Sequence, residues 1–282
     1  MDEKKVLRCG VWDDISLAQA QQVIQLLKVK KPEIDYQTVS VSSDDAADKV
    51  SCMEQAMMDE KIEFTVYSGE EVPIEMPDGF VIAAVTERGD RTDMLLSLPG
   101  RFLRKDDCTG LVIGSASERQ RVLCEGSFPN CKAVLPEGSL TDQIQQLRDG
   151  KMDAMVVSAA AINTLRPDLS GLFIDKLDPN DFIPSAGQGL LAVEVRRRTD
   201  AVMICRSINH PGTQSLYDTE REFMRLLKAD NKEAVGVCAD YASDGSLSIS
   251  AFYKKPTIYK VEPDMRHRKE ALTELANFLR EE

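Results

Sequence analysis

The stretch Ile183-Pro-Ser-Ala-Gly-Gln-Gly-Leu-Leu-Ala-Val-Glu-Val-Arg196 separates two parts of the chain that have different sequence patterns. Before it, short apolar segments alternate with segments of helical periodicity, which predicts an α/β architecture with mostly parallel sheets. After it, the pattern predicts antiparallel strands and a small α+β domain. The glycines within residues 185–189 permit close approach of other backbone. We therefore expect this segment to lie beside a hinge and to face a cleft between domains.

The α/β part repeats its own pattern. The first half predicts strands at 6–11, 34–41, 62–66 and 80–85 and helices at 15–29 and 46–58. The second half predicts strands at 111–113, 133–135 and 152–157 and helices at 117–124, 139–150 and 159–165. The last third predicts helices at 215–227 and 265–280 and strands at 234–241, 246–252 and 257–261. We therefore predict domain 1 from residues 1–86 with 184–200, domain 2 from 92–180, and a C-terminal domain from 203–282.

Composition and charge exclude several classes of protein. The net charge of −12 disfavours nucleic-acid binding, because phosphate contacts need a basic surface. No run of about 18 apolar residues occurs, so no membrane span is expected, and the N-terminus shows no signal-peptide pattern. The seven cysteines form no Cys-x-x-Cys pair and indicate reduced thiols. Because the chain has only two histidines, no metal site is predicted. We expect the protein to be cytoplasmic and monomeric.

Three places could carry chemistry, and each has a structural alternative. The segment Tyr67–Pro73 follows a strand, and its two adjacent acids could transfer protons; the alternative is a solvated turn. The segment Gly114–Ser117 could bind an anion at a helix N-terminus, and the alternative is an ordinary N-cap. Cys238 lies in an apolar strand-like run, and the alternative is a buried core thiol.

The 183–196 stretch resembles the P-A-x-G-Q-G-x-L-x-I-E-x-R segment of the hydroxymethylbilane synthase (porphobilinogen deaminase) family. Ile208–Thr213 and Thr219–Phe223 resemble the family's N-x-x-x-T and A-E-R-x-F/M segments. Leu17–Ala20, Val66–Pro73, Gly114–Ser117 and the segment around Cys238 follow in the family's order. The resemblance therefore covers essentially the whole chain. It implies two domains like those of periplasmic binding proteins and a small C-terminal α+β domain.

The resemblance also implies an activity, a cofactor and site residues. Family members join porphobilinogen units head to tail, with loss of ammonia, in tetrapyrrole (haem) biosynthesis. Cys238 matches the cysteine that carries the family's dipyrromethane cofactor as a thioether, and Glu71 takes the place of the catalytic Asp. The substrate-binding positions are Ser68, Ser115, Ser117, Arg119 and Gln188.

Several departures from the family's motifs remove positive charge. The family's H-S-x-K-D-x-P has Glu70 in place of its lysine, and S-S-L-R-R keeps Arg119 alone, unless Arg121 substitutes for the other. In the R-G-N-x-x-T-R segment both arginines are absent, and Glu137 stands in place of the first. The position of a further family arginine holds Thr164 here, and the position of a family lysine falls near Ser51. Porphobilinogen carries two carboxylates, which arginine clamps with two parallel hydrogen bonds. These losses are expected to weaken binding and to leave the cleft neutral or acidic.

Two hypotheses follow. In the first, the chain is a divergent hydroxymethylbilane synthase in which Cys238 holds the cofactor and Glu71 handles protons at the pyrrole nitrogens and the leaving amine. In the second, it is a non-catalytic relative that binds a different small molecule or a partner in the interdomain cleft. The missing arginines favour weak or absent activity. We predict that the dipyrromethane is absent from this protein and that Cys238 is an unmodified thiol.

Overall fold

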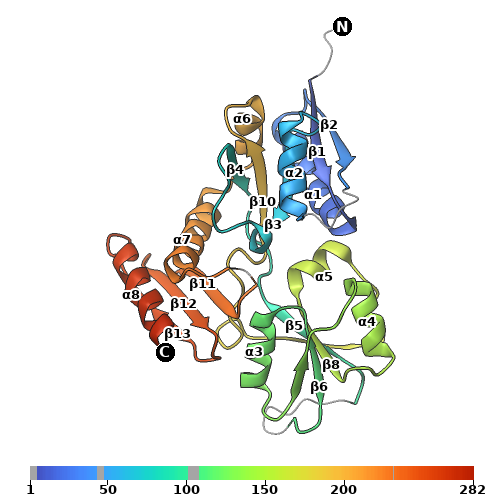
Figure 1. Cartoon of the computed structure of the whole chain (residues 1–282), viewed down its shortest axis with the longest axis vertical. Coiled ribbons are helices and arrows are strands. Elements are labelled where there is room, and N and C mark those ends of the chain that lie inside the picture. Colours follow the sequence, from blue (N-terminus) through green and yellow to red (C-terminus); the bar gives the residue numbers. More distant parts are fainter. Residues whose placement is uncertain (1–4, 43–47, 101–107, 231) are drawn as a thin grey trace. The chain divides into compact units, whose positions relative to one another are not determined.

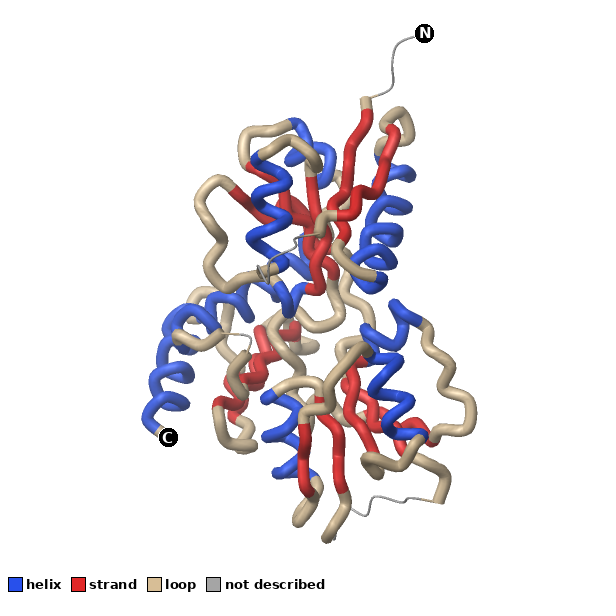
Figure 2. Tube along the Cα trace, turned by 45° about the vertical axis from the view of Figure 1, so that its right-hand side comes forward, coloured by secondary structure: helices blue, strands red, loops and turns tan. Residues whose placement is uncertain are grey.

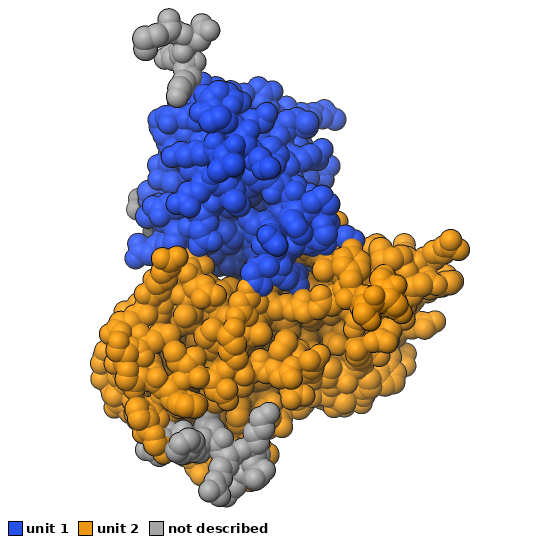
Figure 3. Space-filling model, turned by 180° about the vertical axis from the view of Figure 1, so that it is seen from behind, with its two compact units in different colours: residues 1–89, 189–215 blue, residues 90–188, 216–282 orange. Residues whose placement is uncertain are grey.

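The computed structural model describes residues 5–42, 48–100, 108–230 and 232–282. The chain forms two compact units, residues 1–89 with 189–215 and residues 90–188 with 216–282 (Figure 3). The division into three domains at the boundaries given above remains a prediction. The first two residues of the helix predicted at 46–58 lie outside the described residues.

The first unit contains a five-stranded sheet with the strand order β2-β1-β3-β10-β4 (Figure 1). Its strands are β1 (Val6–Val11), β2 (Asp35–Ser40), β3 (Phe64–Ser68), β4 (Phe80–Val85) and β10 (Leu191–Arg196). Its helices are α1 (Asp14–Lys30), α2 (Lys49–Met58), α6 (Asp200–Arg206) and the short 3-10 turn η1 (Gly69–Glu71). β1 pairs in parallel with β2 and β3, whereas β10 runs antiparallel to β3 and β4. β1, β2, β3 and β4 therefore run in one direction and β10 alone opposes them, as predicted for a mostly parallel sheet; β10 differs because it returns from a distant segment instead of through a βαβ crossover.

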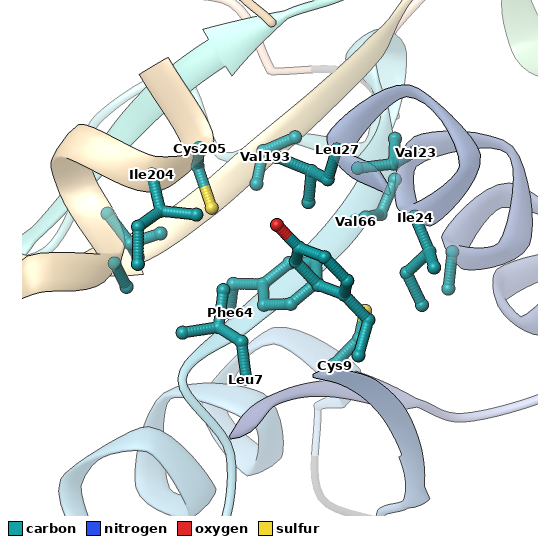
Figure 4. Packing of buried hydrophobic residues seen from close by; sticks show 14 of the residues in the cluster. Leu7, Cys9, Val23, Ile24, Leu27, Phe64, Val66, Val193, Ile204 and Cys205 are labelled. Carbon is teal, nitrogen blue, oxygen red and sulfur yellow. The ribbon is translucent and has the colours of Figure 1, made fainter. Parts of the chain in front are cut away.

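Strand alternation decides which residues fill the core of the first unit. Phe64 and Val66 of β3 and Val193 of β10 point to one face of the sheet, where they pack with residues of α1 and α6 (Figure 4). The intervening residues point to the opposite face, where Met53 of α2 lies within contact distance of Gly10. α1 begins after Asp13, whose side chain accepts a hydrogen bond from the Ser16 amide.

The second unit contains a five-stranded sheet with the order β7-β6-β8-β5-β9. Its strands are β5 (Asp93–Ser97), β6 (Val112–Ser115), β7 (Lys132–Val134), β8 (Ala154–Ser158) and β9 (Phe173–Lys176), with helices α3 (Glu118–Ser127), α4 (Leu140–Arg148) and α5 (Ala159–Leu165). β6 is parallel to β7 and β8, and β5 is antiparallel to β8 and β9. This sheet is also mostly parallel, with β5 alone running against the other strands, but β5 and β9 were not predicted as strands. Within each unit the helices lie against the sheets (Figure 2).

A three-stranded antiparallel sheet completes the second unit, formed by β11 (Val235–Tyr241), β12 (Leu247–Tyr253) and β13 (Tyr259–Val261). α8 (Arg268–Glu281) packs on β12 and β13, and α7 (Pro211–Leu227) spans the division between the units at residue 215. The predicted α/β class with a small C-terminal α+β part is confirmed. Among the described helices, none is both long and apolar enough to cross a membrane.

Candidate functional site

In the first unit, Ser68 and Glu71 lie together where β3 ends. The Ser68 amide donates a hydrogen bond to Glu71 Oε2 at 3.2 Å, which closes the η1 turn. The side-chain amide of Gln19, on α1, donates to Ser68 Oγ at 2.8 Å. Glu71 keeps 41% of its side chain exposed. The turn therefore presents a solvent-accessible carboxylate that can exchange protons with a ligand.

Lys49 supplies a positive charge at this carboxylate. It is the first residue of α2, and its Nζ lies 3.5 Å from Glu71 Oε1 and 5.9 Å from the centre of the Tyr67 ring. Motif comparison placed the family's lysine near Ser51, so this cation was missed as a neighbour of Glu71. The helix predicted at 46–58 could have revealed it. Lys49 is two positions before Ser51 and therefore lies on a different side of that helix.

A buried acid, Glu194, lies on β10 of the same sheet, which α2 contacts. Glu194 is opposite Thr65 in the β3–β10 pairing, so its side chain shares a face with Tyr67. Glu194 is fully buried, and the hydroxyl of Tyr67 is the polar group beside its carboxylate. Burial, with a smaller contribution from the charge of Glu54, raises the pKa of Glu194 to about 8. Glu194 is therefore mostly neutral at pH 7. The only sign of this in the sequence is that an acid stands within the apolar strand 191–196.

In the second unit, Ser115 and Ser117 hold the start of α3. Ser115 is buried, and its hydroxyl donates to the carbonyl oxygen of Val134 at 3.2 Å. Ser117 is the N-cap of α3, and its Oγ accepts the amide of Gln120 at 3.3 Å. Both hydroxyls are engaged in local structure. The contacts support the N-cap interpretation of this segment, and an anion site here remains a prediction.

Arg119 lies inside the second unit. Its side chain is 3% exposed, and its Nη1 is 2.9 Å from Oδ2 of the fully buried Asp93. Nη1 donates to the carbonyl oxygen of Ile183 at 2.7 Å, and Nη2 donates to Gln188 Oε1 at 3.1 Å. Gln120 Nε2 also donates to Asp93 Oδ1, at 2.7 Å. The guanidinium therefore joins α3, β5 and the 183–188 segment, and its charge is balanced within the protein.

Gln188 belongs to the same network. It is buried, its Nε2 donates to the carbonyl oxygen of Arg91 at 2.9 Å, and its Oε1 accepts the Ser185 amide at 3.0 Å. Two residues predicted to bind substrate, Arg119 and Gln188, are thus brought together, but by contacts with the chain itself.

Cys238 lies in β11, at the edge of the three-stranded sheet, and is 9% exposed. It pairs with Ser250 of β12 and packs in a buried cluster that includes Phe182 and Ile183. Asp240, two positions along the same face, forms an ion pair with Arg91. All seven cysteines lie within the described residues and none is in a disulfide. Among the described residues, no group of three or more His, Cys, Asp or Glu side chains is arranged to hold a metal ion.

Comparison with known proteins identifies relatives over most of the chain. A family model described as "Porphobilinogen deaminase, dipyromethane cofactor binding domain" matches residues 13–204. A porphobilinogen deaminase of Thermus thermophilus is 30% identical over 86% of this chain and 82% of its own length. The Rickettsia akari protein of the same name is 28% identical over 88% of this chain and 86% of its own.

Solved structures with lower similarity also match. The VFT2 domain of BvgS from Bordetella pertussis has a TM-score of 0.46 and 15% identity, over 72% of this chain and 86% of that one. An arginine-specific periplasmic binding protein from Salmonella typhimurium has a TM-score of 0.45 and 12% identity, over 72% and 91% of the two chains.

Proposed function

Because the chain belongs to the porphobilinogen deaminase family, we propose that it is a divergent member that has lost most of the family's capacity to bind carboxylates. It consumes porphobilinogen weakly or not at all, and it carries no dipyrromethane on Cys238. The observation that supports this proposal is the environment of Arg119. The one arginine kept from the S-S-L-R-R motif is buried and paired with Asp93, so a ligand would have to displace an internal partner to use it.

The residues around Cys238 fit the dipyrromethane poorly. The attachment atom is present, but that group carries four carboxylates, and each charge-assisted bond to such a group contributes roughly 1.5–3 kcal/mol. Arg91 is already paired with Asp240, and Arg119 with Asp93. A carboxylate left unpaired beside like charge in a partly buried site is unfavourable. We therefore derive no catalytic step through this group.

The chemistry that remains is that of Glu71. Its exposed carboxylate, with Lys49 beside it, can hold or release a proton at a bound amine or pyrrole nitrogen. One methylene more than Asp moves such a carboxylate by about 1 Å, a displacement that can reduce a rate by about 10²-fold. Residual acid–base chemistry is thus compatible with the turn, and tight substrate binding is the capacity that we propose is lost.

The test is the intact mass of the purified protein, followed by Ehrlich's reagent and an assay of porphobilinogen consumption. The Thermus thermophilus relative, expressed and purified in the same way, serves as the positive control. We expect the mass of the unmodified polypeptide, no colour, and consumption at least about 10²-fold slower than in the control. A mass increment on Cys238 with a positive colour reaction would overturn the proposal.

A further inference from the structure

Glu220, an acid of α7, has no role in the function proposed above. It is fully buried, and it belongs to the Thr219–Phe223 motif. Its Oε2 accepts the amide of Gly187 at 2.8 Å, and its Oε1 accepts the amide of Ala239 at 3.0 Å. One carboxylate thus connects the glycine turn at 185–189 to the residue that follows Cys238.

These contacts lie along the open edge of β11. The Val237 amide donates to the carbonyl oxygen of Pro184 at 3.0 Å, so the amides on both sides of Cys238 point away from β12 and are bonded outside the sheet. At Gly236 the backbones approach so closely that a Cβ atom would lie 2.8 Å from the carbonyl oxygen of Ile183. β11 is therefore held against the 183–187 segment on both sides of Cys238.

We propose that Glu220 is a positioning residue for Cys238: its carboxylate fixes β11 against the 185–189 turn and so sets where the thiol is presented. The physical reason is that a buried backbone amide must find an acceptor, and an ionised carboxylate is a stronger acceptor than a carbonyl. Glu220 satisfies two such amides at once. This role does not depend on the proposed function, because it holds whether or not a group is attached to Cys238.

The test compares Glu220→Gln with the unmodified chain. Gln has the same shape, but it offers one acceptor and turns an NH2 group toward the other amide, so one of the two bonds is lost. Glu222→Gln is the matched control, because Glu222 lies on the same helix and its carboxylate instead accepts a bond from Arg268 at 3.0 Å.

The first readout is backbone hydrogen exchange at Gly187 and Ala239. In the unmodified chain we expect both amides to exchange as slowly as the β11–β12 ladder, although β11 is an edge strand. In Glu220→Gln we expect one or both to exchange about ten- to a hundredfold faster, the factor for losing one charge-assisted bond from the closed state. Glu222→Gln should leave both unchanged. Fast exchange of these amides in the unmodified chain would refute the inference even if the variant failed to fold.

The second readout is the rate at which Cys238 is alkylated, followed by peptide mass mapping. Cys124, which is fully buried in the same unit, is the internal reference for opening of the whole unit. We expect Glu220→Gln to accelerate alkylation of Cys238 by a similar factor and to leave Cys124 unchanged. Equal acceleration at both thiols would show a purely global effect and overturn the inference. If Cys238 proves to be modified, which would refute the proposed function, the exchange measurement still decides this inference.

Discussion

Arg119 and Asp93 form an ion pair whose side chains are 3% and 0% exposed, with 2.9 Å between Nη1 and Oδ2. Additional hydrogen bonds from Gln120 to Asp93 and from Arg119 to Ile183 satisfy further polar atoms of the pair. Removing one partner of such a buried pair strongly destabilises the folded chain, because the other partner is left as an uncompensated buried charge.

Replacement of Arg119 should therefore affect stability more than ligand binding. We expect Arg119→Ala to lower the free energy of unfolding by about 3–5 kcal/mol, measured by urea denaturation with circular dichroism. Arg121→Ala is the control, since Arg121 forms only partly exposed pairs with Glu118 and Glu125 and should cost less than about 1 kcal/mol. If the two variants proved equally stable, Arg119 would be available to bind a ligand after all.

Glu194 should make the first unit less stable as the pH rises. Its pKa is raised from 4.5 to about 8 in the folded chain, so between these values the folded state binds more protons than the unfolded state. The free energy of unfolding then falls with rising pH, by at most about 1.4 kcal/mol per pH unit. The Gln side chain of Glu194→Gln cannot ionise. The free energy of unfolding of this variant, relative to that of the unmodified chain, should therefore increase from pH 5 to pH 8.

The measurement uses the fluorescence of Trp12, the single tryptophan, which reports on this unit during urea denaturation. Glu87→Gln, at an exposed acid of the same unit, is the control and should show no such trend. A pH-independent difference between Glu194→Gln and the unmodified chain would contradict a neutral buried carboxyl.

Gly236 should not tolerate a side chain. A Cβ atom there would lie 2.6 Å from Phe252 Cε1 and 2.8 Å from the carbonyl oxygen of Ile183, so β11 would have to move. We expect Gly236→Ala to destabilise the second unit by about 1–3 kcal/mol in chemical denaturation. Gly212→Ala, where the nearest atom outside the adjoining residues is 3.5 Å away, should change stability by no more than about 1 kcal/mol. Equal effects would show that β11 and residue 183 are not in close contact.

The cysteines of the first unit should differ in reactivity. Burial raises the pKa of Cys9 and raises that of Cys205 to about 12, so neither forms the thiolate that attacks an alkylating reagent. Cys52 is only partly buried. At pH 8 we expect iodoacetamide to label Cys52 well before the other two, which should react only after unfolding, as mapped by mass spectrometry. Rapid labelling of Cys9 would contradict the packing in Figure 4.

Strongly periodic segments were predictable from the sequence, whereas weakly patterned ones were not. The strands Val6–Val11 and Phe80–Val85 and the helix Ala159–Leu165 have the predicted bounds. The strand Phe173–Lys176 was missed because all four of its residues are exposed and show no alternation. The strand Asp93–Ser97 was missed because it is buried throughout and therefore shows no alternation of apolar and polar residues.

The sequence by itself determined the family and the α/β class, because motif order and apolar periodicity are local properties of the chain. Only the tertiary structure decided what each charged side chain contacts. Asp93 precedes Arg119 by 26 positions, and the pairing of β5 beside β8 lets the two meet. Lys49 reaches Glu71 in the same way, because α2 lies over the end of β3. Charged residues on separate elements form ion pairs only where strand order and helix packing bring them together. No local sequence pattern specifies that arrangement.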